Sequence, residues 1–107
     1  MSENQVPNTQ RKGVYIVTKD GCKYCVKAKT FLKEHSIPFS TEKMDPESDG
    51  YTNRRQELID QTGQKTFPWI YVGEEFIGGY TELQRSFETF RLHDLLGKIG
   101  IELDTDF

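Results

Sequence analysis

Features that would indicate a membrane, nucleic-acid-binding or disulfide-stapled protein are scarce in this sequence. No apolar run approaches the roughly 18 residues that a membrane-spanning helix needs. The formal net charge of −3 argues against a general binder of nucleic acids or membrane surfaces, because both favour a basic excess. Cysteine occurs only at Cys22 and Cys25, and a bridge over so short a loop would remove little entropy from the unfolded chain. The pair therefore suggests redox chemistry or metal binding instead of a structural staple.

The length and the N-terminal composition set the domain organisation. The 107 residues suffice for one domain with a single core and are too few for two. Residues 1–12 are polar, so we predict a flexible tail there and one folded domain over residues 13–107. The first ten residues lack the apolar segment of a secretory signal. We therefore expect a cytoplasmic, reducing environment, and a monomer that binds neither nucleic acid nor membrane.

Patterns of apolar residues predict the order of the elements. Short runs rich in β-branched and aromatic residues predict strands, as does the weak apolar–polar alternation of residues 39–44, and apolar residues three or four apart predict helices. The predicted strands are Val14–Val17, Phe39–Met44, Trp69–Val72 and Phe76–Ile77; the predicted helices begin at Tyr24, cover Thr52–Gln61 with Gly63 as C-terminal cap, and continue from Leu83 to Ile99. The order β-α-β-α-β-β-α, with room for a further short helix, predicts an α/β fold with a small mixed sheet. The strand order stays open at this point.

The Cys22–Cys25 motif lies where the first predicted strand turns into the first predicted helix. A helix N-terminus offers free N–H groups and a positive dipole end, which favour a thiolate. Such a site can lower the pKa of a thiol from about 8.5 into the range of roughly 3.5–7.5. Lys19, Lys23 and Lys27 add positive charge nearby. We expect Cys22 to be the attacking thiolate and Cys25, one turn into the helix, to be the less exposed resolving thiol.

Two other interpretations of the cysteine pair are open from the residues alone. Both side chains can be ordinary half-buried residues, or they can form half of a zinc site. Against zinc, the sequence has no second Cys-x-x-Cys motif, and its two histidines, His35 and His93, lack the short spacing of a zinc module. A Cys-x-x-Cys motif close to a β-α-β pattern favours redox chemistry.

Two further motifs follow in the second half of the chain. Thr66-Phe67-Pro68 directly precedes a predicted strand, where a proline is tolerated because it need not donate to the ladder. Gly78-Gly79-Tyr80-Thr81-Glu82 follows the predicted hairpin. Paired glycines let backbone approach a ligand closely, and Thr81 is placed to cap the next helix. Each motif alone is compatible with an ordinary loop or turn.

In this order the motifs resemble those of the glutaredoxins, a branch of the thioredoxin superfamily. The resemblance covers residues 13 to about 100. It rests on Lys19-x-x-Cys22-x-Tyr24-Cys25, Thr62-Gly63, Thr66-x-Pro68 and Gly78-Gly79-x-x-Glu82. Thioredoxin itself carries Trp-Cys-Gly-Pro-Cys and lacks such a Gly-Gly element, so it fits less well. The resemblance implies a thioredoxin-like fold with a four-stranded mixed sheet flanked by helices, and a cis peptide bond before Pro68.

The resemblance also implies a glutathione-dependent disulfide oxidoreductase that serves electron transport and cell redox homeostasis, with catalytic Cys22 and Cys25 and no metal. Glutathione would lie in a groove, its cysteinyl part paired with the Phe67 backbone. Cationic or amide side chains suit its glycyl carboxylate, and Glu82 suits its γ-glutamyl ammonium. The implied glutathione-binding residues are Lys19, Tyr24, Arg55, Gln56, Thr66, Phe67, Pro68, Gly79, Thr81 and Glu82.

Two positions depart from the family pattern, and one alternative function stays open. The family usually has Asp at the position of Glu82, and its dithiol members commonly have Pro at the position of Lys23. Both changes bear on reduction potential and kinetics. The implied substrates are protein disulfides and glutathione mixed disulfides, with ribonucleotide reductase among the acceptors. The alternative is a [2Fe–2S] cluster held between two subunits with two glutathiones; Cys25 argues against it, since it offers a disulfide instead.

Overall fold

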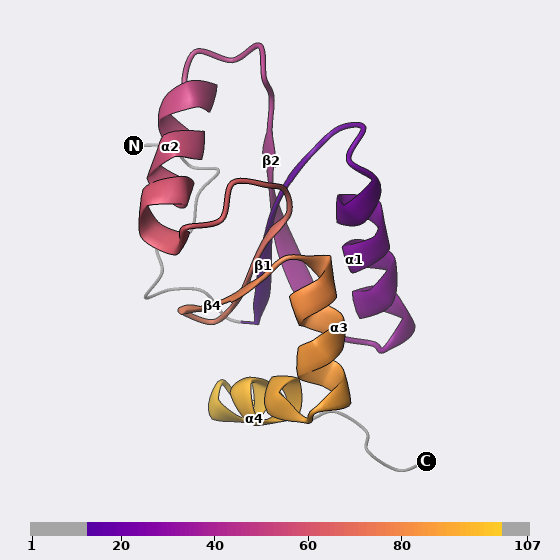
Figure 1. Cartoon of the computed structure of the whole chain (residues 1–107). Coiled ribbons are helices and arrows are strands. Elements are labelled where there is room, and N and C mark those ends of the chain that lie inside the picture. Colours follow the sequence, from indigo (N-terminus) through magenta and orange to yellow (C-terminus); the bar gives the residue numbers. More distant parts are fainter. Residues whose placement is uncertain (1–12, 102–107) are drawn as a thin grey trace.

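The computed structural model describes residues 13–101 (Figure 1), so the predicted tail at residues 1–12 lies outside the described residues. In the described part, no helix is long and apolar enough to cross a membrane. The elements along the chain are β1 (Val14–Lys19), α1 (Lys23–Glu34), β2 (Phe39–Met44), α2 (Tyr51–Thr62), β3 (Trp69–Val72), β4 (Glu75–Gly78), α3 (Tyr80–Glu88) and α4 (Arg91–Lys98).

The four strands form one mixed sheet in the order β2-β1-β3-β4. Strand β1 runs parallel to β2, with Val14 opposite Phe39, and antiparallel to β3, with Val14 opposite Val72. Helix α1 makes the crossover that a parallel pair requires. Strands β3 and β4 form the predicted hairpin, antiparallel to each other. The predicted four-stranded mixed sheet is therefore confirmed.

Helices cover both faces of the sheet because side chains alternate along β1. Val14 and Ile16 belong to a core cluster with residues of α1, α3 and α4. Tyr15 and Val17 point to the opposite face, into a second cluster that includes Leu58 of α2. Figure 1 shows α2 on one side of the strands and α1 with α3 on the other. The site described below lies at the end of the sheet where β1 and β4 end and β3 begins.

The apolar pattern after the hairpin forms two helices. Helix α3 ends at Glu88 and α4 starts at Arg91, and between them Phe90 takes a left-handed conformation with φ of 63°. The helical spacing of apolar residues continues across this break, because Leu83 of α3 and Leu92 of α4 pack into the same core cluster. No glycine or proline marks the break in the sequence. The additional short helix is thus α4.

A mostly buried ion pair fastens α2 to the sheet. The Arg54 guanidinium donates two hydrogen bonds to the Glu42 carboxylate, at 2.7 and 2.8 Å. The Tyr15 hydroxyl donates a third to the same carboxylate at 2.7 Å. Burial lowers the pKa of Arg54, but the hydrogen bonds and charge of Glu42 outweigh this, so its pKa is raised above the ordinary value. The pair sets the position of α2, the helix that also carries Arg55 and Gln56.

Candidate functional site

The cysteine pair lies at the N-terminus of α1. Cys22 is the N-cap residue, reached from β1 through a turn in which Gly21 has a φ of 73°. Cys22 is half-buried, and Cys25, in the first turn of the helix, is 1% exposed. The two residues form a disulfide, with Cα atoms 5.2 Å apart. The predicted difference in exposure between the two thiols is confirmed.

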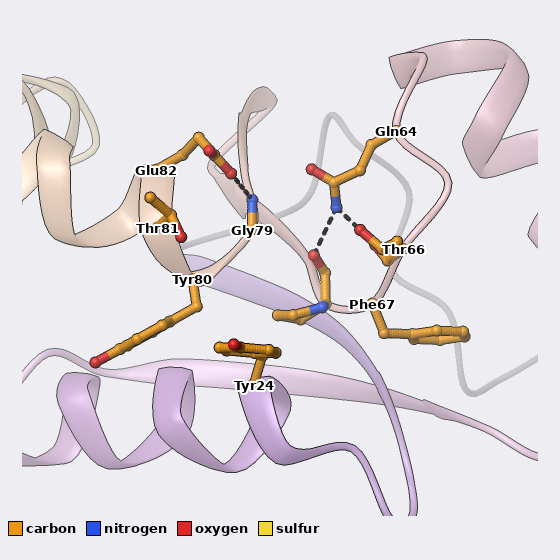
Figure 2. A pocket seen from close by; sticks show the side chains of 9 residues that line it. Tyr24, Gln64, Thr66, Phe67, Gly79, Tyr80, Thr81 and Glu82 are labelled. Atoms are coloured by element: carbon orange, nitrogen blue, oxygen red, sulfur yellow. Dashed lines mark hydrogen bonds between the residues drawn. The ribbon is translucent and has the colours of Figure 1, made fainter.

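The proline loop forms a second part of the site. The peptide bond between Phe67 and Pro68 is cis, as the resemblance implied. The Gln64 amide nitrogen donates hydrogen bonds to the carbonyl oxygens of Thr66, at 2.7 Å, and of Pro68, at 2.8 Å (Figure 2). One side chain thus holds the backbone on both sides of Phe67. Gln64 was not among the predicted site residues.

The Gly-Gly motif forms the third part, and Glu82 packs closely against Gly78. The Glu82 carboxylate accepts a hydrogen bond from the Gly79 amide at 2.7 Å (Figure 2). A Cβ at Gly78, where φ is 120°, would lie 2.6 Å from the Glu82 Cγ. Gly79 is the N-cap of α3 and Thr81 lies inside the helix, so the predicted capping role of Thr81 is wrong. Glu82 provides the side-chain cap instead of Thr81, because the Glu82 side chain reaches back to the backbone amide of the N-cap residue, Gly79.

The proline loop, the Gly-Gly motif and Tyr24, which stands between the two cysteines in the sequence, form a groove. Its cavity measures about 200 Å³. The rings of Tyr24, from α1, and Tyr80, from α3, lie close together beside it, with centroids 6.2 Å apart (Figure 2). The lining residues are Tyr24, Gln64, Thr66, Phe67, Pro68, Gly79, Tyr80, Thr81 and Glu82. Seven of them, all except Gln64 and Tyr80, are predicted glutathione-binding residues.

The three remaining predicted glutathione contacts do not line this groove. Lys19 lies at its Phe67 side, with the ammonium 5.1 Å from the centre of the Phe67 ring. Arg55 reaches the same loop by donating a hydrogen bond to the Lys65 carbonyl at 2.9 Å. Gln56 instead donates to Asp60 on its own helix, at 2.8 Å. Lys19 and Arg55 therefore flank the groove, while Gln56 is directed along α2.

Two lining residues, Gln64 and Tyr80, were missed from the sequence. Tyr80 stands inside the Gly-Gly motif, so its place between Gly79 and Thr81 was a usable signal. Gln64 has no such signal, because its role depends on two carbonyls brought together by the cis loop.

The zinc interpretation gains no support from the histidines. Both rings pack against Phe87, with centroid distances of 4.2 Å for His35 and 5.1 Å for His93. Between residues 13 and 101, no group of three or more His, Cys, Asp or Glu side chains is arranged to hold a metal ion.

Comparison with known proteins agrees with this geometry. The family model described as glutaredoxin matches residues 14–77. Glutaredoxin-C2 of Arabidopsis thaliana is 32% identical over 89 residues, covering 83% of this chain and 79% of the relative. Glutaredoxin 3 of Escherichia coli strain K12 is 34% identical over 70 residues, covering 65% and 80%. A buckwheat glutaredoxin–glutathione complex superposes with a TM-score of 0.75 at 27% identity, covering 84% of this chain and 81% of that one.

The matched region holds both cysteines, the cis-proline loop and most of the hairpin. It spans more than half of the 107 residues. Motif, fold and relatives therefore lead to one assignment: the chain belongs to the glutaredoxin family, whose members are generally thiol-disulfide oxidoreductases.

Proposed function

We propose that the protein reduces protein disulfides and glutathione mixed disulfides through Cys22 and Cys25, with glutathione as the reductant. One observation carries the proposal: Cys22 is the N-cap of α1, and its sulfur accepts a hydrogen bond from the Cys25 amide at 3.2 Å. The same donor would stabilise a thiolate on Cys22 once the disulfide is reduced. The first turn of α1 contains no acidic residue to oppose this.

For a mixed disulfide, the Cys22 thiolate attacks the sulfur of the glutathione half. The substrate's sulfur–sulfur bond breaks, and the protein thiolate leaves and takes up a proton. Cys22 is left joined to glutathione. The thiolate of a second glutathione then attacks the glutathione sulfur in this bond, which releases oxidised glutathione and restores the Cys22 thiolate. In the net exchange, the protein–glutathione disulfide and one free glutathione become a protein thiol and oxidised glutathione, so one glutathione thiol is oxidised for each protein thiol that is restored.

For a disulfide within a protein, the Cys22 thiolate forms a mixed disulfide with one substrate sulfur and releases the other as a thiol. The Cys25 thiolate then attacks Cys22, which releases the second substrate thiol and produces the Cys22–Cys25 disulfide. The structure contains this bond. Two glutathione molecules return the pair to the dithiol. Because Cys25 lies one helical turn from Cys22, the resolving step is intramolecular and favoured over attack from solution.

Glutathione fits the groove by its chemistry. Its cysteinyl part would pair with the Phe67 backbone, which Gln64 and the cis bond hold in place. Lys19 and Arg55 supply cations on one side for the glycyl carboxylate, and the Thr81–Glu82 region receives the γ-glutamyl end. The glutathione complex of the buckwheat relative supports the use of this ligand.

The deciding experiment is an assay in which oxidised glutathione formation is coupled to NADPH oxidation by glutathione reductase. Wild type is expected to reduce the mixed disulfide of glutathione and 2-mercaptoethanol, and Cys22→Ser to be inactive. Neutralising Lys19 and Glu82 together is expected to raise the Michaelis constant for glutathione by roughly tenfold. An unchanged Michaelis constant for glutathione in the double variant would mean that glutathione binds elsewhere. Activity in Cys22→Ser would overturn the mechanism.

We extend the proposal to a monomer acting in the cytoplasm, with ribonucleotide reductase among the acceptors. The [2Fe–2S] alternative remains a prediction from the family resemblance. In it, two subunits would share one cluster, and each subunit would supply one cysteine. An absorbance spectrum of protein purified without oxygen separates the two functions: charge-transfer bands in the visible range would favour cluster binding.

A further inference from the structure

A cationic and aromatic surface lies beside the cysteine pair, next to the glutathione groove. The Lys27 ammonium stands 5.3 Å from the centre of the Tyr24 ring and 6.0 Å from that of Tyr80. Both tyrosines also line the groove, and Lys27 does not. The tyrosine pair therefore separates the proposed ligand from a cation that the ligand does not use.

Lys27 has free hydrogen-bonding capacity. Within residues 13–101, no carboxylate lies within ion-pair distance of its ammonium. A cation–π contact at an exposed site holds the ammonium weakly and leaves N–H donors available for an anion. Lys23 lies one turn earlier on the same helix face and is also exposed. The two lysines thus present adjacent positive charges next to the motif.

Apolar surface is exposed at the same place. Tyr24 is 52% exposed and Val26 is 61% exposed. Only one other large hydrophobic side chain in the described part of the chain, Phe90, is comparably exposed. Exposed apolar groups among uncompensated cations are characteristic of an interaction surface.

We propose that this surface, which we call the Tyr–Lys surface, binds the segment of a protein substrate next to its reactive cysteine and favours acidic segments. It consists of Lys23, Tyr24, Val26, Lys27 and Tyr80. The inference rests on the proposed function and names its substrate class. In a glutathionylated protein the glutathione half occupies the groove, so the protein half must contact the surface around it.

Charge sets the preference. The chain as a whole carries a net charge of −3, so the two lysines form a local positive patch on a molecule that is negative overall. Such a local contrast orients a partner during encounter and discriminates against partners of the wrong charge. A basic flanking segment would meet like charges at Lys23 and Lys27.

The test uses three glutathionylated peptides that differ only in the residues beside the cysteine, which are Glu, Gln or Lys. For wild type, kcat/KM is expected to fall in that order. Lys27→Glu is expected to lower the ratio of the Glu peptide to the Lys peptide by at least about fivefold. High salt should reduce the wild-type ratio, because exposed charges are screened.

Lys33→Glu is the matched control, since it makes the same charge change on the same helix. Lys33 is exposed, lies about 9 Å further along the axis and faces another direction. Its peptide ratio is expected to stay within about twofold of wild type. The mixed disulfide of glutathione and 2-mercaptoethanol, which has no flanking residues, gives the basal rate of each protein. Any effect of Lys27→Glu on the Cys22 thiolate changes this rate and the rates on all three peptides alike, so it cancels in the peptide ratio.

Two results would overturn the inference. An unchanged ratio in Lys27→Glu, or an equal change in Lys33→Glu, would mean that the Tyr–Lys surface does not select the substrate. In either case, turnover of the small mixed disulfide would leave the proposed function standing. If wild type failed to reduce the small mixed disulfide as well, the proposed function would fall together with the inference.

Discussion

The backbone amide of Cys25 donates a hydrogen bond to the sulfur of Cys22 at 3.2 Å. This relationship separates the two cysteines chemically, because the buried residue supplies the donor that stabilises charge on the half-buried one. The N-terminus of α1 and the nearby lysines act in the same direction.

We therefore expect iodoacetamide to alkylate Cys22 in the reduced protein well below pH 8, with Cys25 reacting slowly. Because an ordinary thiol has a pKa of about 8.5, the rate for Cys22 should already be half-maximal at a pH where such a thiol is mostly protonated. Mass spectrometry of the labelled protein against pH gives the measurement, with Cys25→Ser to isolate Cys22. A half-maximal rate near pH 8.5 would contradict the activation.

Cys25→Ser is expected to retain much of the activity on glutathione mixed disulfides and to lose most of its activity on protein disulfides. In the first reaction a second glutathione resolves the intermediate, so Cys25 is dispensable. In the second reaction Cys25 releases the trapped substrate. Parallel assays on a glutathionylated peptide and on a peptide with an internal disulfide measure the difference. Equal loss in both would argue against this division of roles.

Glu82 serves both the fold and the proposed ligand, and two substitutions separate these roles. Glu82→Gln keeps an oxygen that can accept the Gly79 hydrogen bond but removes the charge, whereas Glu82→Ala removes both. We expect the Ala variant to lose about 0.5–2 kcal/mol of unfolding free energy and the Gln variant less. Both should raise the Michaelis constant for glutathione by a few-fold. Denaturant melts and kinetics report the two effects; a normal Michaelis constant in both variants would leave Glu82 as a cap alone.

Gln64 is expected to position Phe67 for glutathione. Gln64→Ala removes both hydrogen bonds to the loop carbonyls, and Gln64→Glu places an acceptor-only group against two acceptors, so the Glu variant should be the more impaired. Each should raise the Michaelis constant for glutathione several-fold with a smaller effect on kcat. Gln61→Ala, an exposed change on α2, is the control. Better glutathione saturation in Gln64→Glu than in Gln64→Ala would contradict the positioning role.

Much of the fold was predictable because its signals are local. The strands at Phe39–Met44 and Trp69–Val72 have the predicted bounds. The first shows weak alternation of apolar and polar residues, and the second is a β-branched and aromatic run ended by a turn. Gly63 caps α2 with φ of 78°, as its position after the helical pattern indicated. The cis bond follows from the family resemblance, whereas the strand order is known only from the structure, because neither is encoded in residue spacing.

The rest depends on long-range geometry. The break at Phe90 is set by packing of α3 and α4 on one cluster. Gln64 matters only because two carbonyls face its amide. The charge of Glu82 suggests a ligand contact, but the sequence does not show that its carboxylate accepts a hydrogen bond from the Gly79 amide. Side-chain destinations of this kind follow from the folded arrangement of several segments.

The ion pair between Arg54 and Glu42 is expected to hold α2 on the sheet. The side chains are 14% and 7% exposed, so removing either one takes away a largely buried ion-pair contact of the other. Arg54→Gln should therefore cost about 2–4 kcal/mol of unfolding free energy. Glu57→Gln, which removes the 53% exposed second partner of Arg54, should cost no more than about 0.5 kcal/mol.

The pH dependence follows from the raised pKa of Arg54. Arg54 contributes its full stability below its ordinary, strongly basic pKa and loses it only as pH rises through the still higher pKa of the folded state. The cost of Arg54→Gln should consequently stay constant between about pH 6 and 9. The double variant Glu42→Gln/Arg54→Gln should be less destabilised than the two single variants added together, because each single variant already loses the same ion pair. Additive losses in urea melts would show that the two groups stabilise α2 independently.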